Sequence, residues 1–276
     1  MTFYQNKNFR RVLIPLLRFF NPGRITIKHH YTGGKFSLDA FHHKGYWFYG
    51  KKRERATMEL FAKLIKPDYI ILEVGGHIGY ITNYFSDLLT KGGIIYVFEP
   101  GINNLPFLRK NIEQLDNVIL IQKAVSDRNG KAKFYIEDLT GQNNSLLPDY
   151  ANFKENSEMS FVKSEKKEVE VETITIDTFC KEYSIIPDFI KIDIEGAELL
   201  ALKGMSAVLS YYSPLMMIEI TENWQHIYET LYEAGYKMYN ENRIEIGMNN
   251  NHSGNTFCFH KIKHKLELDK VIQGIA

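Results

Sequence analysis

Between residues 69 and 121, short continuous apolar runs alternate with stretches of helical apolar spacing, and this alternation constrains the fold more than any other feature. The runs cover residues 69–74, 94–98 and 118–121, and the helical stretches between them cover 79–89 and 103–115. A run without polar alternation is typical of a parallel strand buried on both faces. Strands that alternate with helices predict a mostly parallel sheet covered by helices on both faces, which places the chain in the α/β class.

The alternation resumes toward the C-terminus after a hairpin-like interruption. The expected elements are strands at 188–194 and 215–220, helices at 197–209 and 223–234, and a closing pair of strands at 236–239 and 256–260. The interruption joins 132–136 to 169–176 through a polar insert near 138–168, which is too long for a simple connector. We therefore expect residues 56–276 to form one domain that carries this insert.

Residues 1–55 are expected to form an N-terminal extension with a short helix and strands. Strand-like runs cover residues 25–29, 36–41 and 46–49. The apolar run at 12–20 is interrupted by Pro15 and Arg18 and falls well short of the roughly 20 residues that cross a bilayer. Two interpretations stay open for it: a helix packed against the main domain, which we favour, or a peripheral segment on an anionic membrane surface.

A glycine-rich turn follows the first strand of the main domain, in Glu73-Val-Gly-Gly-His-Ile-Gly79. Glycine lets the backbone approach a ligand closely, and the next helix is expected to begin near Gly79. Glu99 ends the second strand, in Val-Phe-Glu-Pro100. An acid at that place can accept both hydroxyl groups of a ribose. Together the two segments predict a nucleoside site at the carboxyl ends of adjacent strands.

Two cofactors compete for this site. A dinucleotide requires Gly-x-Gly-x-x-Gly, which is absent here, because its pyrophosphate binds at a helix N-terminus. The carboxylate of Glu73 would repel a pyrophosphate, whereas it would attract the ammonium and sulfonium groups of S-adenosylmethionine. The residues therefore favour S-adenosylmethionine over NAD.

A second acidic segment ends the strand expected at 188–194, in Ile-Lys-Ile-Asp193-Ile-Glu195-Gly-Ala-Glu198. An acid that ends an apolar run beside the cleft is costly unless it has a partner, so Asp193 is a candidate functional residue. Glu219 ends the next strand in the same way. Glu195 and Glu198 also suit the first turn of a helix, where carboxylates complement the helix dipole.

At this point the chain resembles the FkbM-type methyltransferases. The resemblance rests on the turn Glu-Val-Gly-Gly-His-Ile-Gly-Tyr, the strand end Val-Phe-Glu-Pro, and Ile-Lys-Ile-Asp-Ile-Glu-Gly-Ala-Glu, with lesser matches in Lys-Ala-Val-Ser-Asp and Met-Ile-Glu-Ile. It spans about residues 70–220. It implies a Rossmann-like seven-stranded class I methyltransferase fold, S-adenosylmethionine as cofactor, and O-methylation of hydroxyl groups in natural products or surface-glycan sugars. The family often has Gly-Ala-Asn where this chain has Gly75-Gly76-His77.

The residues and the resemblance together give the expected site. The expected cofactor contacts are Glu73, Gly75, Gly76, His77, Gly79, Glu99, Pro100, Ala124, Val125 and Asp193. A hydroxyl acceptor must lose a proton, so a general base helps, and by position we choose Asp193 first and Glu219 second. A divalent metal between these two carboxylates is the weaker alternative, because no clean ligand spacing supports it, and we expect no metal.

Charge and cysteine content bear on partners and location. The net charge of +1 disfavours nucleic acid as acceptor, although the basic stretch at 51–55 is a local exception. The expected partner is a small-molecule or glycan hydroxyl acceptor. Cys180 and Cys258 both lie in apolar runs, which excludes a disulfide framework and suits a reducing cytosol, so we expect a cytoplasmic protein.

Other candidate residues have ordinary structural explanations. His29-His30 and His42-His43 lie on strand-like segments, where neighbours point to opposite faces and form no chelating pair. Trp224 and His226, and the polar loop at 141–145, could line an acceptor pocket or simply pack. The alternatives to a methyltransferase are a NAD-dependent oxidoreductase and a catalytically inert Rossmann-like binding module.

Overall fold

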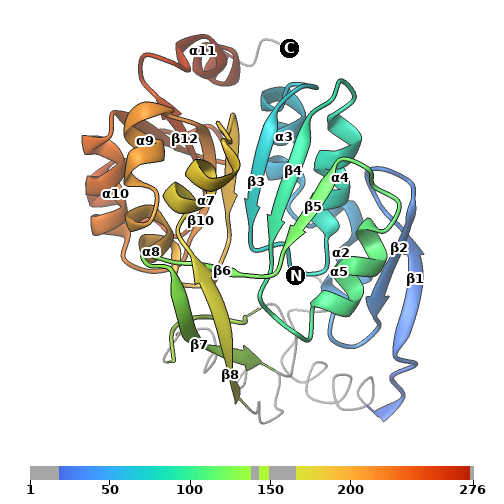
Figure 1. Cartoon of the computed structure of the whole chain (residues 1–276). Coiled ribbons are helices and arrows are strands. Elements are labelled where there is room, and N and C mark those ends of the chain that lie inside the picture. Colours follow the sequence, from blue (N-terminus) through green and yellow to red (C-terminus); the bar gives the residue numbers. More distant parts are fainter. Residues whose placement is uncertain (1–18, 138–142, 149–165, 274–276) are drawn as a thin grey trace.

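The computed structural model describes residues 19–137, 143–148 and 166–273. Its centre is a seven-stranded sheet with the order β11-β12-β10-β9-β3-β4-β5 (Figure 1). The strands are β3 (Ile70–Val74), β4 (Ile94–Phe98), β5 (Val118–Ile121), β9 (Phe189–Ile192), β10 (Leu215–Ile220), β11 (Tyr236–Asn240) and β12 (Gly254–His260). Only β12 runs against the other six strands of this sheet. The predicted α/β class and the closing strand pair are confirmed.

Helices cover both faces of this sheet, as predicted. One buried cluster holds side chains from α7 (Ile176–Tyr183), α8 (Glu198–Lys203), α9 (Ser206–Tyr211) and α10 (Trp224–Glu233). The other holds side chains from α3 (Arg55–Leu64), α4 (Tyr80–Leu88), α5 (Leu105–Ile112) and α11 (Lys265–Gln273). Ile71 belongs to the second cluster and its neighbour Leu72 to the first, as the alternation of side chains along a strand requires. Across the described ranges, none of the helices has the length and apolar character needed to cross a bilayer.

Two smaller sheets flank the central one. β1 (Arg24–Lys28) and β2 (Lys35–Asp39) form an antiparallel hairpin that contacts α5. β7 (Gly130–Glu137) pairs antiparallel with β8 (Lys166–Ile174), and β8 pairs in parallel with the short β6 (Ala124–Val125). The helix expected within residues 12–20 lies mostly outside the described residues, as does most of the insert near 138–168.

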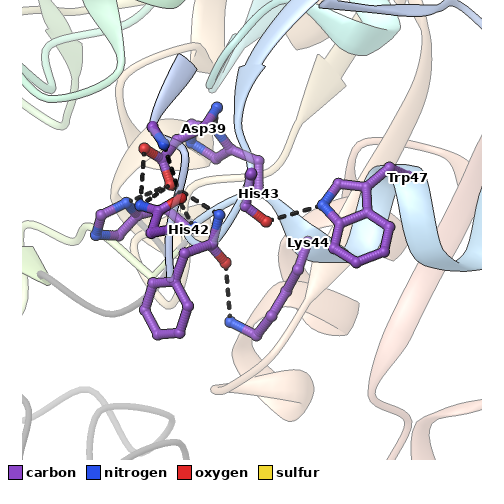
Figure 2. Close-up of polar contacts among 9 residues, drawn as sticks. Asp39, His42, His43, Lys44 and Trp47 are labelled. Atoms are coloured by element: carbon purple, nitrogen blue, oxygen red, sulfur yellow. Dashed lines mark hydrogen bonds and ion pairs between the residues drawn. The ribbon is translucent and has the colours of Figure 1, made fainter. Parts of the chain in front are cut away.

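The strand expected at residues 46–49 is wrong, because α2 (Lys44–Tyr49) occupies this segment and continues into a 3-10 turn, η2 (Gly50–Lys52). The carboxylate of Asp39 accepts hydrogen bonds from the backbone N–H groups of Phe41 and His42, at 2.9 and 2.8 Å, which turns the chain out of β2 (Figure 2). Trp47 then donates its indole N–H back to the carbonyl of Ala40 at 2.8 Å. The aromatic run thus packs onto the turn, and local contacts override its strand propensity.

Three element boundaries also differ from the prediction. The strand expected to end at 176 ends at Ile174, because Thr175 caps α7 and accepts a hydrogen bond from the Thr178 N–H at 3.1 Å. The helix expected at 197–209 divides into α8 and α9, since Asp177 caps the second helix by accepting from two of its backbone N–H groups. Glu195 and Gly196 form a left-handed turn before α8 rather than its first turn.

Candidate functional site

A cavity of about 270 Å³ opens at the carboxyl ends of the central strands. The ends of β3, β4, β9 and β10 form its floor. This is where open α/β sheets bind ligands, because the loops that follow neighbouring strands diverge there. Two other segments complete the walls, one preceding α3 and one following β7. Their lining residues are Tyr46, Arg53, Glu54, Asn143, Asn144 and Leu146.

The glycines of the turn after β3 are required by close contacts. Gly75 has φ +88°, and a Cβ there would lie 1.9 Å from the carbonyl oxygen of Asp193. A Cβ on Gly76 would lie 2.2 Å from a methyl group of Val97. Any side chain at these two positions would collide with Asp193 or Val97. Glycine therefore lets the backbone of the turn pack against these residues at the edge of the cavity.

Glu99 fastens this turn to the end of β4. One carboxylate oxygen accepts from the backbone N–H of His77 at 2.8 Å, and the other accepts from the N–H of Gly101 at 2.8 Å. The side chain is 4% exposed, and burial raises its pKa to about 7, against the opposing effect of these hydrogen bonds. Asn104 also donates to the oxygen that accepts from Gly101, at 3.3 Å, so the oxygen paired with His77 is the one with a lone pair left for a ligand.

Glu73 lies inside the sheet, beneath the glycine turn. It is 1% exposed, and its Oε2 has no hydrogen-bond partner among the described residues. Burial raises its pKa to about 7, while the nearby ammonium of Lys191 opposes that rise. A buried acceptor without a partner is costly, and such a group in a cavity wall is available to a ligand that donates or carries positive charge.

Asp193 and Glu219 face each other across the ends of β9 and β10. Lys191 donates to Asp193 Oδ2 at 3.0 Å and to the carbonyl of Gly75 at 3.1 Å. The carboxylate of Asp193 raises the pKa of Glu219 well above its ordinary value, and burial adds to the rise. Each carboxyl group therefore disfavours ionisation of the other, and the ammonium of Lys191 lies beside Asp193.

The wall formed by residues 46–54 was not predicted as part of the site. Tyr46 is buried and shares a hydrogen bond with His77 Nδ1 at 3.1 Å. The guanidinium of Arg53 lies 4.5 Å from the centre of the Tyr46 ring and donates to Glu54 at 3.0 Å. The only sequence signal for this wall was the basic stretch at 51–55, which stands out as a local exception to the near-neutral charge of the chain.

The segment 143–148 forms the opposite wall. Ser145 pairs with Tyr135 of β7 through backbone hydrogen bonds, and its hydroxyl donates to the carbonyl of Glu195 at 2.7 Å. Asn144 donates to Asn103 at 2.9 Å, just before α5. This part of the predicted polar loop therefore lines the cavity, and residues 141–142 lie outside the described residues.

The structure brings together nearly all of the predicted site residues. Those lining the cavity are Glu73, Gly75, Gly76, His77, Glu99, Pro100, Ala124, Val125, Asp193 and Glu219. Gly79 does not line it: it has φ +85° and begins α4, where a Cβ would lie 2.9 Å from Leu108. Trp224 packs in the core and donates to the carbonyl of Met248, away from the cavity lining.

The histidine pairs have structural partners. His29 contacts the carbonyl of Tyr80 at 3.0 Å, and His43 packs against His77 with 5.2 Å between the ring centroids. Within the part of the chain that the structure describes, no group of three or more His, Cys, Asp or Glu side chains is arranged to hold a metal ion.

Comparison with known proteins adds two sequence findings. Residues 73–238 match the Methyltransferase FkbM domain. The chain is also 30% identical over 156 residues to a protein named 2-O-methyltransferase NoeI from Sinorhizobium fredii. That alignment covers 55% of this chain and 63% of the relative, so it leaves more than a third of the relative unmatched.

Solved structures with similar folds were also found. One is a methyltransferase FkbM from Methylobacillus flagellatus, with 16% identity, a TM-score of 0.47, and coverage of 71% of this chain and 44% of that chain. Another is the Aeropyrum pernix fibrillarin in complex with S-adenosyl-L-methionine, with 12% identity, a TM-score of 0.41, and coverage of 86% of this chain and 93% of that chain.

Proposed function

The chain belongs to the FkbM family of methyltransferases and uses S-adenosylmethionine, and from this premise we propose that it methylates a hydroxyl group of a sugar, in a glycan or glycolipid precursor. A hydroxyl of a natural product is the second acceptor class that the family resemblance implies. Because the chain belongs to a methyltransferase family, we discard the two alternative functions, a NAD-dependent oxidoreductase and an inert binding module. The free, buried thiols of Cys180 and Cys258 support a cytoplasmic location.

The cavity residues fit this cofactor. Gly75 and Gly76 let the turn pack closely against Asp193 and Val97 at the edge of the cavity, and Glu73 Oε2 is a buried acceptor without a partner among the described residues. Glu99, with a lone pair left on Oε2 at the end of β4, is placed to accept from a ribose hydroxyl, and the glycine turn and Glu73 would hold the charged end. When bound, S-adenosylmethionine supplies a methyl group on a positively charged sulfur, which a hydroxyl oxygen can attack directly.

The observation that carries the hydroxyl acceptor is the carboxyl pair of Asp193 and Glu219. A hydroxyl that attacks an electrophile loses its proton, and a carboxylate within reach can accept that proton. Lys191 fixes Asp193 by a hydrogen bond of 3.0 Å, and Asp193 is 25% exposed to the cavity. We therefore assign Asp193 as the general base, and Glu219, whose pKa Asp193 raises, as a positioning residue.

The rest of the cavity supports a polyhydroxylated acceptor. Carboxylates at Glu54 and Glu195 and amides at Asn143 and Asn144 lie on its lining. Carboxylate and amide oxygens accept hydrogen bonds from hydroxyl groups, and amides also donate to them. The relative from Sinorhizobium fredii is named a 2-O-methyltransferase, which agrees with oxygen as the methylated atom.

The first test is calorimetric titration of the full chain with S-adenosylmethionine, S-adenosylhomocysteine and NAD. We expect binding of the first two and none of NAD, with binding abolished in Glu99→Ala. Absence of S-adenosylmethionine binding in a folded sample would refute the cofactor site.

The acceptor is tested separately with radiolabelled S-adenosylmethionine and a panel of sugars, lipid-linked sugars, small phenols and amines. The proposal requires labelled methyl ethers of sugars, and loss of that product in Asp193→Asn while cofactor binding persists. Labelling of amines or phenols alone would contradict the sugar acceptor without affecting the cofactor assignment.

A further inference from the structure

The N-terminal segment carries an apolar hollow outside the catalytic cavity. Its lining residues come from the two ends of the β1–β2 hairpin and from α2: Phe20, Asn21, Pro22, Ile25, Ala40, Phe41 and Trp47. Phe20 and Trp47 are 69% and 37% exposed. Phe19, 83% exposed, packs edge-on against Phe20 with 5.0 Å between the ring centroids. A contiguous group of exposed aromatic side chains on an otherwise polar surface marks an interaction site.

One cation, Lys44, contacts a residue of this hollow, and a second, Arg24, is the neighbour of one in the chain. The ammonium of Lys44 lies 4.6 Å from the centre of the Phe41 ring and donates to the Phe41 carbonyl. Figure 2 shows Lys44 beside Trp47, whose indole is fixed by its hydrogen bond to the backbone at the end of β2. The exposed Arg24, which precedes Ile25 of the hollow, places its guanidinium 4.9 Å from the centre of the Phe107 ring. Aromatic and cationic groups therefore share this surface.

The charge of the chain is segregated toward the same segment. Residues 1–53 contain 11 Lys and Arg residues and one acidic residue, Asp39, whereas residues 54–276 contain 23 Lys and Arg against 32 Asp and Glu. The near-neutral chain is thus the sum of a segment of charge +10 and a remainder of charge −9. Such a segment attracts an anionic partner over the range of a Debye length.

We propose that this docking surface, made of Phe19, Phe20, Trp47, Arg24 and Lys44, binds a bilayer that contains anionic lipids. Aromatic side chains with one apolar and one polar end settle at the level of lipid head groups, and Lys or Arg beside them interacts with anionic lipids. The proposal goes beyond the methyl transfer and does not depend on it.

Two other partners fit less well. The phosphates of nucleic acid would bind the cations, but they would leave the apolar hollow lined by Pro22, Ile25 and Ala40 unfilled. Residues 1–18 of the same chain carry four Lys and Arg and no acidic residue, so their charge has the same sign as that of this surface and does not neutralise it. An anionic lipid surface fits both, because its acyl chains can contact the apolar side chains while its head groups contact the cations.

The test is cosedimentation of the full chain with vesicles of phosphatidylglycerol and phosphatidylcholine in equal parts, against vesicles of phosphatidylcholine alone. We expect binding to the anionic vesicles only, weakened by added salt. Two double variants, Phe19→Ser with Phe20→Ser and Arg24→Gln with Lys44→Gln, are each expected to weaken binding by about tenfold or more. S-adenosylmethionine affinity reports that both variants fold.

Matched controls change the same groups elsewhere. Tyr211→Ser with Tyr232→Ser removes aromatic side chains that are 82% and 64% exposed on α9 and α10. Lys265→Gln with Lys270→Gln removes two exposed charges on α11. Both controls should bind vesicles like the unchanged chain. Failure to bind anionic vesicles, equal losses in variants and controls, or binding to duplex DNA with none to vesicles would each overturn the proposal.

Discussion

Lys191 places its ammonium 3.0 Å from Asp193 Oδ2, although Lys191 itself is only 1% exposed. A buried ammonium is tolerated when carboxylates and backbone carbonyls surround it. Here Asp193, the carbonyl of Gly75 and the nearby Glu73 surround the ammonium. The two carboxylates raise the pKa of Lys191 against the effect of burial. One cation thus joins the end of β9 to the glycine turn after β3.

Lys191→Met should destabilise the fold and slow methyl transfer. Removal of the cation takes a hydrogen bond from Asp193 and the neighbouring positive charge from the buried Glu73, which costs about 3 kcal/mol of unfolding free energy. Urea denaturation followed by circular dichroism measures this loss. The rate of methyl transfer at saturating cofactor should also fall, because Asp193 loses the hydrogen bond of 3.0 Å that holds it in place.

A double variant separates charge from packing in this cluster. Lys191→Met combined with Glu73→Gln leaves one fewer buried carboxylate, and it should recover part of the lost stability. If the effects of the two changes on the unfolding free energy were simply additive, Glu73 and Lys191 would not interact, and the charge cluster inferred above would be refuted.

Glu99→Gln should weaken S-adenosylmethionine binding by about tenfold to a hundredfold, the effect of losing one charged hydrogen bond to a ribose hydroxyl. Isothermal titration measures the dissociation constant. Glu113→Gln is the matched control, because Glu113 is an exposed carboxylate that pairs with Lys110 at the end of α5. Equal affinities for the two variants would place the ribose elsewhere.

Gly75→Ala and Gly92→Ala form a matched pair of glycine substitutions. Both glycines have positive φ, at +88° and +80°, so both variants suffer backbone strain of about 1 kcal/mol. Only Gly75→Ala adds a contact of 1.9 Å with the carbonyl of Asp193, whereas nothing lies within 4 Å at Gly92. We expect Gly75→Ala to lose cofactor binding and Gly92→Ala to keep it. Thermal unfolding and titration measure both effects, and loss of binding in both variants would point to strain alone.

Affinity for S-adenosylmethionine should increase as the pH rises through neutrality. Burial raises the pKa of Glu73 and of Glu99 to about 7, so both are protonated in more acidic solution and ionised in more basic solution. The ionised forms attract the sulfonium, whereas S-adenosylhomocysteine lacks that charge. The ratio of the two affinities should therefore grow between about pH 6 and about pH 8, and Glu73→Gln should flatten it. A constant ratio in the unchanged chain would contradict this electrostatic role of Glu73.

The sequence predicted the central sheet and the cofactor end of the cavity well. Continuous apolar runs such as Ile70–Val74 have few other ways to be buried, and acids or glycines that end such runs must meet at one edge of the sheet. The placement of Glu73, Glu99 and Asp193 on one cavity followed from this rule. Their roles as ligand contacts remain predictions that the variants above test.

The wall formed by residues 46–54 and the position of Gly79 could not be predicted in the same way. Tyr46 lies in an aromatic run whose strand propensity is overridden by the turn at Asp39, and the direction of its side chain depends on that turn. Gly79 was assigned to the cofactor by its spacing alone, although its Cα faces Leu108. Contacts between segments far apart in the chain decide both cases, and local periodicity does not report such contacts.

The wall that contains Tyr46, Arg53 and Glu54 precedes residues 73–238, the part that matches the family domain. One wall of the cavity and the glycine turn are therefore encoded in separate stretches of the gene. A recombination event that replaced the first 55 codons would exchange this wall in one step while leaving the glycine turn, Glu99 and Asp193 intact. The shape of the cavity could change in this way without the slow co-adaptation of residues scattered through the sheet.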